Sequence, residues 1–360
     1  MKKLKLVIVF LLCIAVMAAC KKTEVPKDTS SAEATAAPVS SQAPVEEAAT
    51  PTPAAAAVDI AAEKLEMKIA ALKGPTAIGM VKQMEDAATG TTANNYQYTI
   101  AGTADEITTG LVKGDFDIAA VPCNMASVLY NKTEGKIKLA GINTLGVLYI
   151  VETGDTIHSV ADLKGKTIYS TGLGTTPQYT LNYILNSNGI DPEKDVTVVY
   201  KSEPTEVAAI LSKTADAVAM LPQPYVTSVM LNNDKVRVAL DVAKEWEAVS
   251  TDGSSVVTGV VVVRSEFLEK NQEAMNTFMA EYQASTAYVN ENVDAAAGLV
   301  EKFDIFKAAV AKKAIPDCNI TLIQGENMKT KVNGYLTALF QQNPKAVGGK
   351  LPTEDFYYIP

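Results

Sequence analysis

The sequence contains few of the residues on which most enzyme chemistry depends. Its 360 residues include one histidine, four cysteines and one tryptophan. The histidine, His158, lies in a polar stretch that is typical of an exposed loop and not of a general base. No CxxC pair or combined cysteine and histidine spacing suggests a metal, and there is no Gly-x-Ser-x-Gly nucleophile elbow. The sequence therefore predicts no catalytic residue, no metal site and no cofactor.

The cysteines give no clear disulfide. Cys13 and Cys20 lie in the N-terminal segment, so only Cys123 and Cys318 remain in the folded part. These two could pair, but the sequence does not place them within bonding distance. Two buried thiols fit the sequence at least as well.

Basic residues are outnumbered. The chain has 32 lysines and arginines against 41 aspartates and glutamates, which gives a net charge of −9. An acidic surface argues against nucleic acid or an anionic lipid surface as the main partner. An anionic small ligand is not excluded, because a pocket can differ in sign from the surface around it.

No hydrophobic run is long enough for an ordinary membrane span of about 20 residues. Leu6–Met17 is apolar and follows three lysines, which is the pattern of a secretory signal peptide. The segment Met17–Cys20 resembles a bacterial lipobox, in which the cysteine is lipidated and becomes the first residue of the mature protein. We predict a lipoprotein signal peptide over 1–19 with lipidation at Cys20. The alternative is a plain secretory signal cleaved near Ala19.

The next segment, 20–63, is rich in Ala, Pro, Ser, Thr and Glu and has no apolar periodicity. Such a composition cannot bury a core, so we predict a disordered tether. The protein is then expected outside the cytoplasm, held at the cell membrane through the lipid on Cys20.

The folded part repeats one order of elements. The first copy has a strand ending at Ala70–Leu72, the turn Lys73–Thr76, and a closing strand within Gly114–Pro122. The second copy starts at Lys166–Ser170, continues through the turn Thr171–Pro177, and closes within 215–222. Each copy predicts strand, glycine-containing turn, helix, strand, helix and strand. Two α/β lobes built alike predict a ligand cleft between them.

The elements after residue 258 do not continue the second copy. Thr258–Arg264 predicts a strand, and long helical patterns follow over Glu266–Asn290, Val293–Phe303 and Asn327–Gln342. We expect lobe one to comprise 64–149 plus 258–360, and lobe two to comprise 152–250. Two strands would cross between the lobes, near Gly146–Val151 and Val256–Val262, and form a hinge.

In open α/β sheets, ligands bind beyond the carboxyl ends of the strands, where helices begin. Four loops qualify, and Lys201–Glu203 is a fifth after its own strand. The candidate ligand-binding residues from the four loops are Lys73, Gly74, Pro75, Thr76, Pro122, Asn124, Ser170, Thr171, Gly172, Gly174, Thr175, Thr176, Gln223 and Tyr225.

The loop 170–177 is the strongest candidate. Gly172 and Gly174 let backbone N–H groups approach a ligand, while Thr175 and Thr176 offer hydroxyls or a helix cap. The loop is neither a Walker loop nor a dinucleotide fingerprint, since it lacks Gly-Lys-Ser/Thr and a third glycine. The alternative is an ordinary turn that caps a helix.

Three side chains in the other loops each have two alternative roles. Lys73 pairs with an anionic ligand or is a solvated lysine at a strand end. Tyr225 forms a wall for an aromatic ligand or caps a helix. Asn124 donates to a ligand or caps its own helix.

Four segments, with the order of the lobes, carry a resemblance to a known family: Lys73–Pro75, Gly114–Ala119, Asp162–Lys166 and Asp216–Ala219. Over about residues 64–360 the chain resembles the extracytoplasmic solute-binding proteins of ABC importers with the type II periplasmic-binding fold. It is most similar to the branch with nitrate, sulfonate, taurine and hydroxymethylpyrimidine receptors.

The resemblance implies a two-lobed α/β fold with a two-strand hinge, and it makes the four loops the ligand-contacting set. It implies capture of a small polar or anionic solute, such as a sulfonate, nitrate or a pyrimidine, without chemistry. The lobes would close on the ligand, and the closed form would dock on a membrane permease. Independently of the resemblance, the tether and the acidic surface suit a monomer.

Two other functions are alternatives. A lipid-anchored sensor domain that reports ligand occupancy to a receptor kinase would have the same sequence features. A pyrimidine-precursor synthase has a similar fold, and its family uses an active-site histidine and a pyridoxal-phosphate lysine. His158 precedes the first full strand of lobe two, away from the cleft loops, which disfavours the enzyme.

Overall fold

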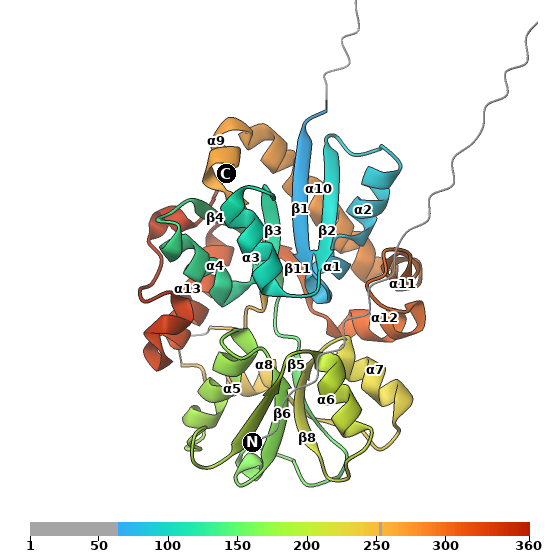
Figure 1. Cartoon of the computed structure of the whole chain (residues 1–360), viewed down its shortest axis with the longest axis vertical. Helices are drawn as coiled ribbons and strands as arrows, with labels where there is room; N and C mark the ends of the chain where they lie inside the picture. Colours follow the sequence, from blue (N-terminus) through green and yellow to red (C-terminus); the bar gives the residue numbers. More distant parts are fainter. Residues whose placement is uncertain (1–63, 252–253) are drawn as a thin grey trace, which may run out of the picture. The chain divides into compact units, whose positions relative to one another are not determined.

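Two β-sheets organise residues 64–251 and 254–360, the part of the chain that the computed structural model describes (Figure 1). The expected signal peptide, the lipidated Cys20 and the tether lie outside these residues. The described residues all fall in one compact unit. Within them, no helix combines the length and the apolar character needed to cross a membrane.

The first sheet has six strands in the order β11-β4-β10-β3-β1-β2. The strands are β1 (Glu66–Leu72), β2 (Asn95–Ala101), β3 (Ile118–Pro122), β4 (Ile137–Thr144), β10 (Gly259–Arg264) and β11 (Ile320–Ile323). Strand β1 runs parallel to β2 and β3, whereas β10 is antiparallel to both β3 and β4. We refer to this sheet and its helices as lobe one.

The second sheet has five strands in the order β7-β6-β8-β5-β9. The strands are β5 (Leu148–Glu152), β6 (Thr167–Thr171), β7 (Thr197–Lys201), β8 (Val218–Pro222) and β9 (Arg237–Asp241). Here β6 is parallel to β7 and β8, and β5 is antiparallel to β8. The trio β7-β6-β8 therefore matches β2-β1-β3, which confirms the repeated order of elements. We refer to this sheet and its helices as lobe two.

Helices cover both faces of each sheet. Lobe one has α1 (Pro75–Ile78), α2 (Val81–Ala88), α3 (Ala104–Lys113), α4 (Cys123–Lys132), α9 (Ser265–Lys270), α10 (Gln272–Glu291), α11 (Val293–Lys302), α12 (Ala308–Ala314) and α13 (Gly325–Gln342). Lobe two has α5 (Thr176–Ser187), α6 (Pro204–Leu211), α7 (Tyr225–Asn232) and α8 (Val242–Val249). Buried hydrophobic side chains form four clusters, one on each sheet face.

Several elements differ from the sequence predictions. The helix expected over 266–290 is divided at Asn271, whose side chain donates to Phe267 O and competes with the regular helix ladder. The strand expected from Thr258 begins one residue later, at Gly259. The sequence patterns did not predict α12 or β11, which are only seven and four residues long. They did not predict α8 either, although Asp241 caps this helix by accepting from Ala243 N and Lys244 N.

The chain passes between the two sheets twice, once over residues 145–147 and once between the end of α8 and the start of β10. The first crossing is tightly packed, because a Cβ atom on Gly146 would lie 2.5 Å from the Ala243 Cβ. The side chain of Asn319 also donates to Gly146 O. These contacts fix the chain where it leaves lobe one.

The two cysteines of the described residues are free and buried. Cys123 lies in the cluster under α4 and α13, and Cys318 lies in the cluster on the other face of the same sheet. Burial raises the pKa of both thiols. Of the two alternatives, the structure has the buried thiols.

Candidate ligand-binding cleft

A cavity of about 270 Å³ lies where the carboxyl ends of the central strands of both lobes meet. Lobe one contributes the ends of β1, β2 and β3 and the helix starts that follow them. Lobe two contributes the ends of β6, β7 and β8 in the same way. The remaining walls come from the two crossings. The cavity therefore has residues of both lobes on its surface, at the place that the strand-end rule predicts.

Ten of the fourteen candidate residues line this cavity. They are Lys73, Pro75, Thr76, Pro122, Thr171, Gly172, Thr175, Thr176, Gln223 and Tyr225. The other four, Gly74, Asn124, Ser170 and Gly174, lie directly behind the lining residues and bond to the protein itself.

Asn124 connects the two lobes. Its Nδ2 donates to Gly174 O at 3.3 Å and to Ala346 O at 3.1 Å, and its Oδ1 accepts from the Thr176 hydroxyl at 3.3 Å. Asn124 is fully buried at the start of α4 in lobe one, whereas Gly174 and Thr176 belong to lobe two. The asparagine therefore holds the start of α5 against lobe one.

The other three residues shape the backbone of the loops. The Gly174 N–H donates to Gln178 Oε1 at 2.7 Å, and the Ser170 hydroxyl donates to Thr171 O at 3.2 Å. Gly74 has φ 137° at the start of α1, a conformation that favours glycine. These residues set the positions of their neighbours at the cavity wall.

Other residues, which were not among the fourteen candidates, also line the cavity. They are Leu72, Gly102, Thr103, Ala104, Thr144, Val147, Leu148, Pro177, Ser202, Pro204, Pro222 and Thr258. Ser202 belongs to the fifth loop, and the strand-end rule applied to β2 would have found Thr103. Thr144 and Thr258 had no such signal, because they lie beside the crossings and not before a helix.

The lining is uncharged apart from one residue. Lys73 is the only charged side chain on the wall, and no carboxylate lines the cavity. The starts of α3, α4, α5, α6 and α7 all contribute lining residues, so the positive ends of their dipoles face the cavity. Five prolines add apolar wall between the hydroxyls of threonine, serine and tyrosine. This surface suits a hydrogen-bond acceptor or anionic group on an apolar body, and disfavours a cation.

Contacts between the lobes lie on both sides of the cavity. On one side, the rings of Tyr225 (lobe two) and Phe306 (lobe one) meet edge to face, with centroids 5.0 Å apart. Burial, with a smaller effect of Glu203, raises the pKa of Tyr225 and keeps its hydroxyl protonated. On the other side, the hydroxyls of Thr180 and Tyr335 lie 2.7 Å apart.

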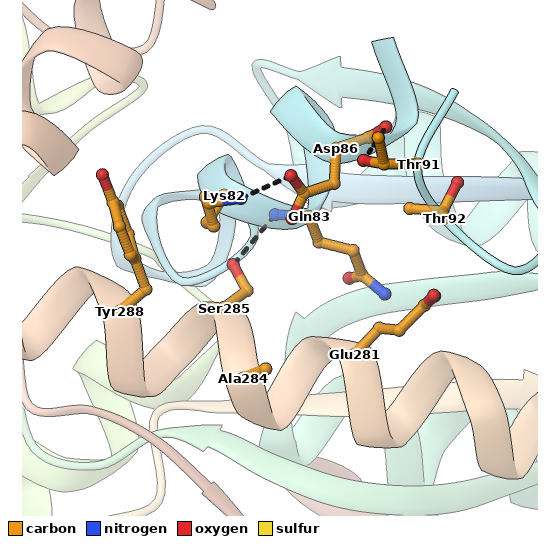
Figure 2. Close-up of a pocket in the computed structure, with 9 residues that line it drawn as sticks. All are labelled: Lys82, Gln83, Asp86, Thr91, Thr92, Glu281, Ala284, Ser285 and Tyr288. Atoms are coloured by element: carbon orange, nitrogen blue, oxygen red, sulfur yellow. Dashed lines mark hydrogen bonds and ion pairs between the residues drawn. The ribbon is translucent and has the colours of Figure 1, made fainter. Parts of the chain in front are cut away.

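A second pocket of about 370 Å³ lies between α2 and α10 of lobe one (Figure 2). Lys82 forms an ion pair with Asp86, and the Ser285 hydroxyl accepts from Gln83 N at 3.1 Å and donates to Gly79 O at 2.8 Å. The ion pair lies within α2, whereas the bonds of Ser285 join α10 to α2 and to the turn before it in the same lobe. The pocket receives no residue from lobe two, so it is not our candidate for a site that responds to lobe movement.

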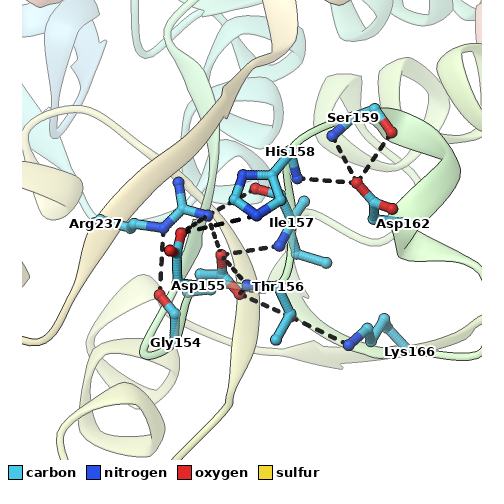
Figure 3. A network of polar contacts seen from close by, with 10 residues as sticks. Gly154, Asp155, Thr156, Ile157, His158, Ser159, Asp162, Lys166 and Arg237 are labelled. Atoms are coloured by element: carbon cyan, nitrogen blue, oxygen red, sulfur yellow. Dashed lines mark hydrogen bonds and ion pairs between the residues drawn. The ribbon is translucent and has the colours of Figure 1, made fainter.

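His158 lies far along lobe two from the cavity, in the polar network of Figure 3. Strand β5 pairs Leu148 with Pro222 at the cavity end and Glu152 with Val218 at the opposite end, next to the histidine loop. His158 Nε2 lies 3.9 Å from Asp155 Oδ1, and both side chains are exposed. Among residues 64–251 and 254–360, no cluster of histidine, cysteine, aspartate and glutamate is placed to hold a metal ion.

The two repeated lobes, the double crossing and the cavity between them define the type II periplasmic-binding-protein fold, a two-lobed α/β architecture. Residues 137–296 match the family model described as NMT1/THI5 like. A comparison with curated protein sequences gives no match.

Solved structures share this fold over most of the chain. An ABC transporter protein from Parabacteroides distasonis is 26% identical, with a TM-score of 0.69, over 82% of this chain and 99% of that one. The periplasmic aliphatic sulphonate binding protein of Escherichia coli is 18% identical, with a TM-score of 0.66, over 82% and 92%. The alkanesulfonate-binding protein of Xanthomonas axonopodis pv. citri, bound to MOPS, is 14% identical, with a TM-score of 0.62, over 81% and 96%. These findings confirm the fold and the resemblance that the sequence indicated.

Proposed function

We propose that the protein is the substrate-binding lipoprotein of an ABC importer. It captures a small solute between its lobes and delivers it to a membrane permease. The observation that carries the proposal is the cavity at the facing strand ends, with walls from both lobes and a single charged lining residue, Lys73.

The chemistry of the wall supports a solute with an anionic or acceptor-rich head and an apolar body. Lys73, the hydroxyls and the helix N-termini suit the head, and the prolines with Leu72 and Val147 suit the body. A sulfonate with a short alkyl chain has this form, and two structural relatives are named for binding such compounds. Nitrate, which is smaller, and pyrimidines, which are uncharged, are the alternative ligands.

The contacts across the cavity support a mechanism of lobe closure. Lobe one and lobe two would move as units about the two crossings. The contacts from Asn124 to lobe two and from Tyr225 to Phe306 would be made on closure. The ligand must bind the closed form more tightly than the open form, or its presence would not reach the permease.

Attachment to the membrane is the second part of the proposal. A signal peptide over 1–19, a lipid on Cys20 and a tether over 20–63 would hold the protein at the outer face of the cell membrane. Replacing Cys20 by alanine is expected to release the protein from the membrane fraction. If the variant remains with the membranes after a salt wash, the lipid anchor is wrong.

The function is tested by native mass spectrometry of the full-length chain purified without denaturant, followed by thermal shifts with ethanesulfonate, taurine, nitrate, pyrimidines and amino acids. A bound small mass, or a shift of several degrees with one class, supports a solute receptor. Trp246, the only tryptophan, is buried between Tyr183 of lobe two and Tyr335 of lobe one, so its fluorescence reports closure. If the purified protein carries no ligand and no compound of the panel shifts its melting temperature, the proposal is wrong.

A further inference from the structure

Unpaired polar atoms gather at the floor of the cleft. Seven buried side-chain oxygens of the described residues have no hydrogen-bond partner, and three of them belong to Asn143, Thr144 and Thr258. Buried polar groups are normally paired, because an unpaired one loses its water and gains nothing in return. A concentration of three at one place therefore needs a physical reason.

The two threonines lie side by side although 114 positions separate them in sequence. Thr144 is the last residue of β4, and Thr258 directly precedes β10. Thr258 N donates to Thr144 O at 3.0 Å, and Gly259 is the strand partner of Thr144. Each threonine thus adjoins one of the two crossings, and both line the cavity.

The packing at Gly259, next to Thr258 in the chain and paired with Thr144, is tight. A Cβ atom on Gly259 would lie 2.5 Å from Asn143 Oδ1 and 2.6 Å from Thr76 Cγ2. The side chain of Asn143 is also fixed by a hydrogen bond, because its Nδ2 donates to the Tyr282 hydroxyl at 3.1 Å. The remaining open side of Thr144 and Thr258 is the cavity, and rotation about the Cα–Cβ bond can turn a threonine hydroxyl toward it.

We propose that the hydroxyls of Thr144 and Thr258 bind the polar head of the ligand and thereby make closure depend on occupancy. This inference rests on the proposed function. In the closed arrangement without ligand, both hydroxyls are buried and unpaired, which disfavours closure. When the lobes part, water reaches the hydroxyls, and when a ligand occupies the cavity, its acceptor atoms pair with them. The empty receptor is thus kept open and the loaded receptor is held closed.

The test uses the full-length chain and replaces the two threonines by valine, singly and together. Valine keeps the shape of threonine and removes the hydroxyl. We expect each replacement to weaken ethanesulfonate binding about tenfold in isothermal titration, the effect of one lost hydrogen bond to a charged group. We also expect the ligand-free double variant to have the smaller radius of gyration of the loaded wild type in X-ray scattering, because the obstacle to empty closure is gone.

Two controls separate this coupling from a general effect on folding. The pair Thr144→Ser and Thr258→Ser keeps both hydroxyls and is expected to bind like the wild type and to remain open when empty. Tyr98→Phe removes another buried, unpaired hydroxyl, which lies on β2 outside the cavity lining. It is expected to change neither affinity nor radius of gyration.

The outcomes are distinct. Valine variants with wild-type affinity overturn the inference and leave the proposed function standing, and so do serine variants that lose as much as the valine variants. A double valine variant that stays open when empty overturns the coupling to closure. If the wild type binds another panel member, the same comparison is made with that compound. If it binds none of them, both the proposed function and this inference are wrong.

Discussion

Two polar clusters differ in how many of their groups have hydrogen-bond partners. One surrounds Glu152 in lobe two, and the other lies at Thr144 and Thr258, beside the crossings between the lobes. At the end of β5 remote from the cavity, the buried Glu152 carboxylate accepts from Thr156 N, Ile157 N and the Thr156 hydroxyl, and pairs with Arg237. At the cavity floor, the hydroxyls of Thr144 and Thr258 have no partner within the described chain.

The difference separates a group that stabilises the fold from the hydroxyls that, in our proposal, bind the ligand. Burial alone would raise the pKa of Glu152, but the hydrogen bonds from Ile157 and Thr156, with the charge of Arg237, together lower it. Its negative charge is therefore favoured in the folded state. The hydroxyls of Thr144 and Thr258 at the cavity floor have no such partners in the described chain. Their hydrogen bonds therefore have to come from outside the chain.

The largest expected effect concerns the paired cluster. Glu152→Ala removes a carboxylate whose side chain is 1% exposed and leaves Arg237 without its buried partner. Breaking a buried ion pair costs about 3–5 kcal/mol. We expect a loss of about 3 kcal/mol in the free energy of unfolding here, because the side chain of Arg237 is one third exposed. Urea denaturation measures the loss, and ligand affinity should not change. A tenfold loss of affinity would contradict the separation of the two clusters.

The same carboxylate predicts a dependence of stability on pH. The pKa of Glu152 in the folded protein is lower than its ordinary value of 4.5, so the unfolded chain takes up the proton first as the pH falls. The stabilisation is complete above about pH 5 and is lost as the pH falls through the lowered pKa. Urea midpoints between pH 6 and 3 should therefore fall more steeply for the wild type than for Glu152→Ala. Parallel curves would show that Glu152 does not contribute.

The next effect concerns the packing behind the cavity floor. Gly259→Ala places a methyl group 2.5 Å from Asn143 Oδ1 and 2.6 Å from Thr76 Cγ2, so we expect a loss of about 1–3 kcal/mol. Because Thr76 lines the cavity, ligand affinity should fall as well. The matched control is Gly298→Ala in α11, where no atom lies within 4 Å of the new methyl group. That change should stabilise by about 0.5–1 kcal/mol and leave binding unchanged.

The smallest effect concerns the apolar rim. Phe306→Leu replaces the edge-to-face contact with Tyr225 by an aliphatic one, and such aromatic pairs contribute about 0.5–1.5 kcal/mol. We expect ligand affinity to fall about threefold, because the contact joins the lobes beside the cavity. Isothermal titration measures the change. A larger loss than that of the threonine variants would show that the rim, and not the floor, controls closure.

The sequence predicted the parts of the fold that local patterns encode. The repeated order of strand, turn, helix, strand, helix and strand predicted the elements of both trios, β2-β1-β3 and β7-β6-β8, but not the order of the strands within the sheets. Ten candidate residues reached the cavity wall because each lies at the end of a strand or in the loop and helix start that follow it. Whether they bind a ligand stays a prediction.

The remaining features depend on segments that are distant in sequence. Strand β11 is only four residues long and exists through its pairing with β4. The role of Asn124 depends on lobe two lying against it, and the pairing of Thr144 with Gly259 joins residues more than one hundred positions apart. A local pattern carries no information about such approaches, so only the folded arrangement reveals them.

The pairing of Thr144 with Gly259 also has a mechanical consequence. Lobe two leaves lobe one just after one of these residues and returns just before the other, so in topology it is an insertion between two neighbouring strands. Both ends of the described chain, the start of β1 and the C-terminal segment, belong to lobe one. A force applied between the ends of the protein would therefore pass through lobe one and bypass lobe two, whose fold would carry no load while the β4–β10 pair remains intact.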